Sequence, residues 1–345
     1  MPPLGRRSFL AAGAVLTTGL AGCARTIPEA YDDGPGWGWT RQARPLDLGV
    51  THVEYSLAPT DPPEALARGR AVLAGAGRWQ NQHLMGWGAL NPEPAPGADD
   101  WSSLDPRFSL IAGTGGRAVL TVAGAPDWMK GAPPGTTDFG RLEEAPLPRH
   151  YDDLAALAAR AVARYPQVAA VLVWNEFKGF YDEARGGWDA AGYTDLYERV
   201  AAAVKRARPE VLVGGPYVPM DLWASGDVAP SDLRGPWGVT DGRALAAVEY
   251  WLANHSVADL VVVDGGTATR DGGLVTDAVT AAERFAATTS WLRERTGLPV
   301  WWAEFYPEPD RSASGRDDPG GAARAAAAVA AVAALAPAGA SAASL

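Results

Sequence analysis

The sequence predicts a single α/β domain in which eight parallel strands alternate with helices and close into a barrel. From residue 46 onward, short apolar runs alternate with Ala- and Leu-rich amphipathic stretches. The run A-A-V-L-V-W at 169–174 is apolar on both faces, which is typical of a parallel strand covered by helices. Eight such runs favour a (β/α)8 TIM barrel over an open, doubly wound sheet.

The predicted elements follow one another in a regular order. Strands are expected at 48–53, 80–86, 118–122, 169–174, 211–214, 260–263, 300–303 and 340–345. Helices are expected at 63–77, 104–112, 151–164, 193–207, 243–254, 277–296 and 322–335. Because the sequence stops at or within strand 8, we expect an incomplete barrel with a weakly paired seam between strands 7 and 1.

The N-terminal 22 residues are predicted to be an export signal. The string R-R-S-F-L, which begins at Arg6, resembles a twin-arginine signal, and the apolar run at 9–22 is too short to span a bilayer. L-A-G-C at 20–23 resembles a lipobox that ends in Cys23, the only cysteine of the chain. An ordinary signal with a chance Arg pair is the alternative.

Three segments follow from these patterns: a signal peptide at 1–22, a Pro- and Gly-containing tether at 23–45, and a catalytic domain at 46–345. Lipidation of Cys23 predicts an exported lipoprotein on the outer face of the cytoplasmic membrane, with a secreted protein as the alternative. The membrane is therefore expected as a partner only through this N-terminal anchor.

Composition excludes several classes of partner and site. The chain of 345 residues has a formal net charge of −10, which argues against a nucleic-acid partner. One cysteine rules out an internal disulfide framework and a Cys-rich metal site, and no metal or cofactor is expected. Fourteen Trp residues suit either sugar stacking or core packing.

Two glutamates occupy the positions where barrel enzymes hold their chemistry. Glu176 follows the fourth predicted strand, and Glu304 follows the seventh, so both are expected at the C-terminal rim. Cleavage of a glycosidic bond requires such a pair of carboxyl groups around the anomeric carbon. The alternative is that each Glu only caps a strand or pairs with an arginine.

The same residues carry a family resemblance. W-N-E at 174–176 and A-E-F at 303–305 resemble the strand-4 and strand-7 motifs of clan A glycoside hydrolases. Within that clan the chain is similar to glycoside hydrolase family 39, the β-xylosidase and α-iduronidase family. The supporting stretches are T-H-V-E-Y-S at 51–56, G-A-P-D-W-M at 124–129 and G-G-P-Y-V at 214–218.

The resemblance implies that Glu176 is the acid/base, Glu304 the nucleophile, and Asn175 a hydrogen-bond partner of the substrate 2-hydroxyl. In a retaining enzyme the two carboxyl groups lie about 5–5.5 Å apart. The chain departs from the family pattern at three places. Phe177 replaces a frequent Pro, strand 6 ends in Asp264 instead of Tyr or His, and the strand-8 Trp is missing.

Further side chains near strand ends are candidates for binding a sugar. Tyr217 is a candidate hydrogen-bond donor to the nucleophile, and His52 and His83 are candidate partners of sugar hydroxyls, although a lone His is more often part of the core. Four indoles are candidates either for stacking on sugar rings or for packing: Trp87, Trp128, Trp174 and Trp302.

Taken together, these patterns predict an exported retaining glycoside hydrolase that cleaves a β-linked oligo- or polysaccharide and is xylosidase-like. The alternative is a non-catalytic carbohydrate-binding lipoprotein on the same barrel. The presence of both glutamates and of Asn175 favours the enzyme, because a binding protein needs no paired acid and nucleophile.

Overall fold

The computed structural model describes residues 30–32, 38–40, 46–58, 60–307 and 321–345. It divides into two units, residues 1–43 and 44–345. In the first, β1 (Ala30–Asp32) and β2 (Gly38–Thr40) form an antiparallel pair with Ala30 opposite Thr40, inside the stretch predicted as a tether. The predicted signal peptide and Cys23 lie outside the described residues.

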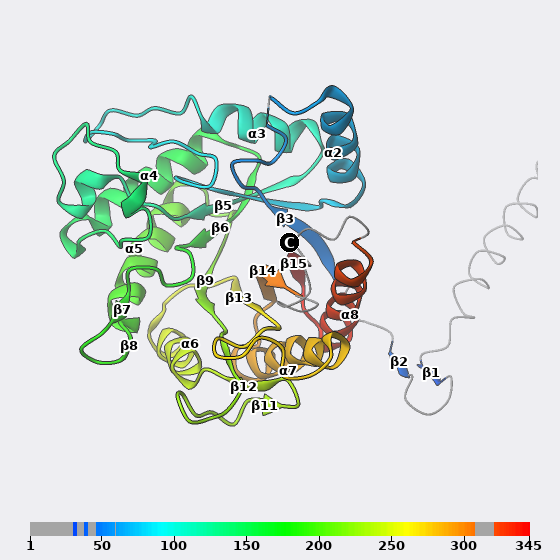
Figure 1. The fold of residues 1–345 in the computed structure, drawn as a ribbon. Helices are drawn as coiled ribbons and strands as arrows, with labels where there is room; N and C mark the ends of the chain where they lie inside the picture. The colour runs from blue at the N-terminus through cyan, green and yellow to red at the C-terminus, as the bar shows by residue number, and fades with distance from the viewer. Residues whose placement is uncertain (1–29, 33–37, 41–45, 59, 308–320) are drawn as a thin grey trace, which may run out of the picture. The chain divides into compact units, whose positions relative to one another are not determined.

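The second unit is a closed barrel of eight parallel strands, which confirms the predicted fold class (Figure 1). Around the barrel the order is β13-β14-β15-β3-β4-β5-β6-β9. In chain order the strands are β3 (Asp47–Thr51), β4 (Trp79–His83), β5 (Arg117–Val122), β6 (Val168–Val173), β9 (Leu212–Pro219), β13 (Leu260–Gly266), β14 (Val300–Tyr306) and β15 (Ala342–Ser344).

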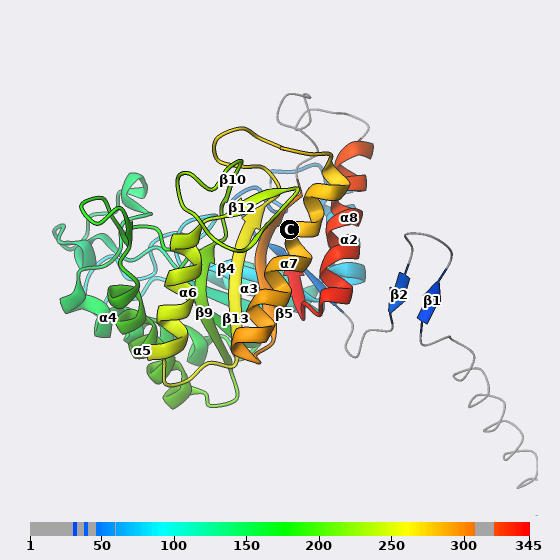
Figure 2. The same cartoon turned by 90° about the horizontal axis from the view of Figure 1, so that it is seen from below.

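A helix follows each of the first seven barrel strands, and Figure 2 shows α6, α7 and α8 outside the sheet. The helices are α2 (Pro63–Ala76), α3 (Leu104–Gly113), α4 (Tyr151–Arg164), α5 (Ala190–Ala207), α6 (Gly242–Asn254), α7 (Ala278–Thr296) and α8 (Ala322–Ala338). Aspartates at 189, 241 and 277 cap α5, α6 and α7 by accepting backbone N–H bonds. None of the described helices is long and apolar enough to cross a membrane.

The loops at the strand ends contain short elements that the sequence did not predict. They include a strand pair, β7 (Tyr181–Asp182) with β8 (Gly187–Trp188), and a three-stranded sheet in which β12 (Gly238–Thr240) lies between β10 (Leu222–Trp223) and β11 (Arg234–Gly235). Three 3-10 turns lie between β5 and α4: η1 (Asp127–Lys130), η2 (Phe139–Arg141) and η3 (Pro148–His150).

The seam between strands 7 and 1 is paired, which corrects the expectation of a weak seam. Ala342 and Ala343 of β15 pair with Trp301 and Trp302 of β14, and β15 pairs with β3 on its other side. The three residues of β15 suffice to close the sheet because the strands on both sides supply hydrogen-bond partners. Directly after β15, Leu345 O accepts a 2.9 Å bond from Thr51 N. The described sheet therefore closes without an open edge.

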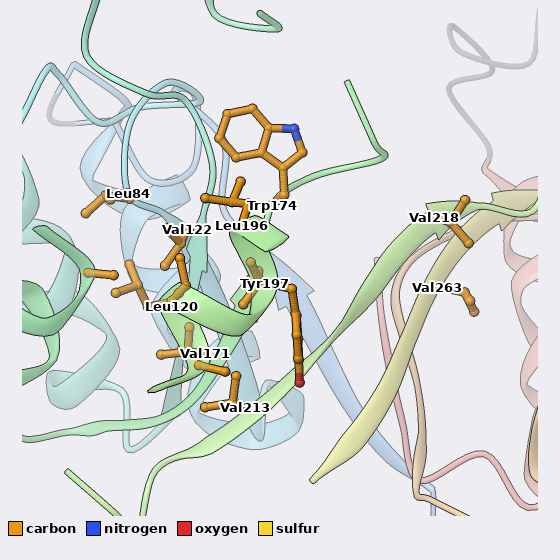
Figure 3. Close-up of a cluster of buried hydrophobic side chains, with 14 of the residues drawn as sticks. Leu84, Leu120, Val122, Val171, Trp174, Leu196, Tyr197, Val213, Val218 and Val263 are labelled. Carbon is orange, nitrogen blue, oxygen red and sulfur yellow. The ribbon is translucent and has the colours of Figure 1, made fainter. Parts of the chain in front are cut away.

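Two apolar layers hold the barrel. One fills its interior and includes Trp79, Leu172 and Trp301. The larger layer lies between the strands and the helices. Figure 3 shows part of it, where Trp174, Leu196 and Tyr197 meet the outward side chains of β5, β6 and β9. Because both faces of β6 and of most of β13 are buried, these strands are apolar over most of their length, whereas β4 (W-Q-N-Q-H) carries buried polar side chains.

Candidate active site

Four of the barrel strands bring acidic and phenolic side chains to their C-terminal ends. Glu176 follows β6, Tyr217 belongs to β9, Asp264 to β13, and Glu304 to β14. Both glutamates are partly exposed, and the charge of Glu176 acts on Glu304. The structure thus brings the two predicted carboxyl groups into one electrostatic site at the rim where barrel enzymes carry their chemistry.

The chain makes a sharp turn where it leaves β6. Trp174, Glu176 and Phe177 have φ angles of 68°, 51° and 52°, a region that non-glycine residues seldom adopt. Two contacts hold the turn: Trp174 Nε1 donates to Lys178 O at 2.7 Å, and the Phe177 ring stacks on Tyr193 at 4.1 Å. Surrounding packing is needed to keep such a backbone, and such residues cluster at active sites.

Glu304 is held by two hydroxyl groups. Tyr217 OH donates to its Oε1 at 2.9 Å, which confirms the expected contact, and Tyr306 OH donates to Oε2. Burial, followed by the negative charge of Glu176, raises the pKa of Glu304 to about 7, although Tyr217 and Lys178 act in the opposite direction. The carboxylate is therefore oriented, and it gains or loses its proton near neutral pH.

Glu176 lies beside a cation that the sequence analysis did not assign to the site. Lys178 Nζ is 3.0 Å from Glu176 Oε2 and 3.0 Å from Glu143 Oε1. Burial lowers the pKa of Lys178, but the two carboxylates outweigh it, so the pKa lies above its ordinary value. Lys178 is thus a positive charge held between Glu176 and Glu143.

Asp264 is a third carboxyl group of the site. It pairs in register with Glu304 across β13 and β14 and is only 3% exposed, and the charge of Glu176 acts on it. Burial, then the charges of Glu176, Glu304 and Asp221, raise its pKa well above the ordinary range. The sequence analysis noted Asp264 at the end of strand 6 only as a departure from the family pattern. Its position opposite Glu304 depends on the register between two strands, which the sequence does not show.

Asn175 and His83 lie next to the glutamates. Asn175 is buried and interacts with the ring of His83, while its Oδ1 has no hydrogen-bond partner among the described residues. Burial and then the charge of Lys178 lower the pKa of His83 to about 3, so the ring is neutral. Trp87, which is partly exposed, lies 4.5 Å from that ring. These side chains form the part of the site nearest β4.

His52 takes a structural position instead of the predicted binding role. Its ring is 3% exposed and its Nε2 lies 3.1 Å from Gln80 Oε1, and Gln80 in turn donates to Thr114 Oγ1 at 3.0 Å. Thr114 lies at the end of α3, so this chain of hydrogen bonds joins the outside of β4 to a helix. His52 is thereby used in packing.

The structure also corrects the stacking role of three indoles. Trp128, Trp174 and Trp302 are 8%, 1% and 1% exposed, and all three belong to the layer between strands and helices. Their Nε1 groups donate to Glu93 O, Lys178 O and Thr289 Oγ1, respectively. A sugar ring needs an open indole face, and of the four candidate indoles only Trp87 is partly exposed.

No clustered metal site occurs among the described residues. There is no group of three or more His, Cys, Asp or Glu side chains arranged to hold a metal ion in the described ranges. The carboxyl groups of Glu304 and Glu176 instead contact tyrosine hydroxyls and the ammonium group of Lys178. This arrangement is suited to proton transfer and to the attack of a carboxylate on carbon.

Comparison with known proteins places the fold among glycosidases. No protein-family model matches the chain, and a search of curated proteins finds no match. Among solved structures, a monomeric β-xylosidase from Caulobacter crescentus CB15 aligns with a TM-score of 0.51 and 19% identity, over 78% of this chain and 54% of that one. A glucosidase from Croceicoccus marinus aligns with a TM-score of 0.53 and 15% identity, over 88% and 59% of the two chains.

A GH39 enzyme from Xanthomonas axonopodis pv. citri also aligns, with a TM-score of 0.50 and 19% identity over 77% of this chain and 53% of that one. The resemblance to family 39 that the sequence motifs indicated is thus confirmed at the level of the fold. The chain spans a little over half the length of these three structures. At this identity the likeness concerns the barrel, and the activity has to be argued from the site.

Proposed function

We propose that the chain is a retaining glycoside hydrolase that cleaves β-linked saccharides and resembles a xylosidase in its substrate. The observation that carries the proposal is the pair Glu176 and Glu304 on one rim, with the second carboxylate held by two tyrosine hydroxyls. The likeness of the barrel to a β-xylosidase and a glucosidase supports it.

In the first step Glu304 attacks the anomeric carbon while Glu176 gives a proton to the leaving oxygen. The bond from carbon to that oxygen breaks with both electrons on the oxygen, and a glycosyl ester forms on Glu304. In the second step Glu176 takes a proton from water, the water oxygen attacks the same carbon, and Glu304 leaves as a carboxylate. Tyr217 and Tyr306 keep the attacking carboxylate oriented in both steps.

The two glutamates should respond differently to removal, which tests the proposal. Glu304→Ala should abolish hydrolysis, and azide should restore turnover as an α-glycosyl azide because a small anion can replace the nucleophile. Glu176→Ala should keep activity on dinitrophenyl glycosides, whose leaving groups need little protonation, and lose about 10²–10⁴-fold on unactivated ones. Glu283→Gln on the exposed face of α7 is the matched control.

Several results would contradict these roles. If both alanine variants behave alike on activated substrates, the division into acid/base and nucleophile is wrong. A carboxyl separation near 9 Å in a saccharide complex would indicate inversion instead of the predicted spacing of about 5–5.5 Å. Saccharide binding without turnover by the unaltered chain would favour the non-catalytic alternative.

We also propose that the chain is exported through its twin-arginine motif and anchored by lipid at Cys23. The basis is the order of Arg6, Arg7 and the sole cysteine in the first 23 residues. Cys23→Ser should move the protein from the membrane fraction to the soluble extracytoplasmic fraction. Recovery of Cys23→Ser in the membrane fraction as fully as the unaltered chain would contradict the anchor.

A further inference from the structure

Resting on the proposed function, we propose that Lys178 is a positioning residue that holds the carboxyl group of Glu176 in the orientation needed for proton transfer, and that Glu143 holds Lys178. The basis is a pair of contacts: Lys178 Nζ lies 3.0 Å from Glu176 Oε2 and 3.0 Å from Glu143 Oε1. A carboxyl group exchanges a proton through one oxygen at a time. Lys178 therefore anchors Oε2 and leaves Oε1 for the oxygen of the leaving group or of water.

The backbone of Lys178 is fixed at the turn that follows β6. Its N–H donates to Asn175 O at 3.1 Å, and its carbonyl oxygen accepts from Trp174 Nε1 at 2.7 Å. The next residue, Gly179, has a φ of 77° and packs so closely on the loop before α4 that a Cβ there would lie only 2.7 Å from Glu143 O. A glycine permits this close approach of two backbone segments. The approach brings Glu143 and Lys178 together.

Buried ionic contacts hold the loop that carries Glu143. Lys130 pairs with Asp127 at 2.7 Å, and neither side chain is more than 1% exposed. Lys130 Nζ also donates to Arg141 O at 2.7 Å, and Arg141 Nη2 donates back to Lys130 O at 3.2 Å. Breaking a buried ion pair is costly, so these contacts keep the loop in place. Glu143, two residues after Arg141, is thereby presented to the turn that follows β6.

The side chain of Lys178 is confined beside Glu176. Its ammonium group lies over the ring of Trp87, 5.0 Å from the centroid, and the side chain is 24% exposed. The side chain of Glu143 is 66% exposed, and an ion pair so open to water adds little stability. The contacts of Lys178 therefore serve orientation more than folding. Without them the carboxyl group of Glu176 turns more freely about its last bond, because the preferences of that torsion are broad.

Both steps of the proposed reaction use the oriented carboxyl group. Glu176 gives a proton to the leaving oxygen in the first step and takes one from water in the second, and Lys178 gains or loses no proton in either step. A displacement of about 1 Å from the productive geometry can cost about 10²-fold in rate. Because proton donation matters most for a poor leaving group, the contribution of Lys178 depends on the leaving group.

Lys178→Met tests the proposal, because Met keeps an apolar stem beside Trp87 and removes the ammonium group. We expect kcat/KM on unactivated glycosides to fall by about 10-fold or more, while kcat/KM on dinitrophenyl glycosides changes by less than about 3-fold. Lys178→Arg should restore part of the lost rate. Lys205→Met is the matched control and should change neither value, because Lys205 is also in an ion pair, 2.6 Å from Asp259, and is 23% exposed.

Two kinetic results would overturn the proposal. An equal fall on both kinds of substrate in Lys178→Met would show a merely structural role. A rise in kcat/KM on unactivated glycosides would show that the ammonium group opposes proton transfer. Both results require turnover by the unaltered chain, whereas the absence of that turnover would contradict the proposed function itself.

Nuclear magnetic resonance tests the contacts without turnover. The chain has only three lysines, Lys130, Lys178 and Lys205, so 15N labelling of lysine reports each ammonium group separately. The signal that disappears in Lys178→Arg should move in Glu143→Gln and in Glu176→Gln, and the Lys205 signal should stay in both. An unmoved Lys178 signal overturns the proposal even if the chain hydrolyses no glycoside. If Lys178→Met does not fold, Glu143→Gln should still lower kcat/KM on unactivated glycosides alone, by about 3-fold, and an equal effect on both substrates counts against the proposal.

Discussion

The hydrogen bond from Tyr217 to Glu304 is one of several contacts that determine the pKa of Glu304. The hydroxyl of Tyr217 is fully buried and donates to Glu304 at 2.9 Å, and this bond favours the ionised carboxylate. Burial and Glu176 act in the other direction and bring the pKa of Glu304 to about 7. Tyr217, together with Lys178, therefore favours the ionised form of Glu304, the proposed nucleophile, at neutral pH.

At this scale we predict that activity is lost as the pH falls through about 7, because protonated Glu304 cannot attack carbon. Tyr217→Phe removes a donor to the ionised form, so the acidic limb of the kcat/KM profile should move to higher pH and kcat at pH 7 should fall by about 10-fold or more. Tyr250→Phe, at a partly exposed site on α6, should leave the profile unchanged. A limb that moves to lower pH in Tyr217→Phe would contradict the prediction.

Among the elements, β14 shows what the sequence does and does not determine. Its apolar composition predicted a buried strand, and the carboxylate at its end was predicted with it. Trp301 points into the barrel and Trp302 into the helix layer. Because both faces of such a strand are buried, hydropathy does not distinguish these two directions, and the stacking role assigned to Trp302 failed for this reason.

The same limit applies to the polar residues of the site. Glu176 and Tyr217 were predicted because each lies two or three residues beyond a recognisable apolar run, at 169–174 and 211–214. The electrostatic interaction between Asp264 and Glu176 connects the ends of two strands that are not neighbours in the sheet, so it depends on how the barrel closes. No local pattern contains that information.

For β14 we predict that Trp302→Phe lowers stability and spares substrate binding. The indole packs on Phe285 at 4.9 Å between centroids and donates to Thr289, so the loss of volume and of one hydrogen bond should cost about 1–3 kcal/mol. Urea unfolding should record this loss, and KM should stay within about 2-fold of the unaltered chain. A large rise in KM without a loss of stability would reinstate Trp302 as a stacking residue.

For the whole molecule, the raised pKa of Glu304 lowers the free energy of unfolding at neutral pH and above. The pKa of Glu304 rises from an ordinary 4.5 to about 7 on folding. Between these values the folded chain binds a proton that the unfolded chain has lost, so this group's contribution to stability declines as the pH rises from 4.5 to 7. The buried carboxylate of Glu304, the proposed nucleophile, therefore lowers the free energy of unfolding at neutral pH and above.

Glu304→Gln should consequently be more stable than the unaltered chain at pH 8, by on the order of 1–3 kcal/mol, because Gln avoids an ionised carboxylate at a largely buried position. The difference should shrink toward zero near pH 5, where Glu304 of the folded chain is already protonated. Thermal or urea unfolding at both pH values checks this, with Glu283→Gln as the control. If the difference in stability between Glu304→Gln and the unaltered chain grows as the pH falls, folding lowers the pKa of Glu304, and the predicted upward shift is wrong.

The left-handed backbone at the strand ends has a consequence for protein engineering. Trp87, Trp174, Glu176, Phe177 and Tyr217 all adopt φ angles that glycine accepts more easily. A redesign that optimised backbone preference alone would select glycine at these positions and would remove the proposed acid/base, the donor to Glu304 and the partly exposed indole of Trp87 together. The positions at which conformational criteria most readily suggest glycine are thus the ones to keep unchanged, because they include both side chains of the proposed site and the buried side chains that pack beneath it.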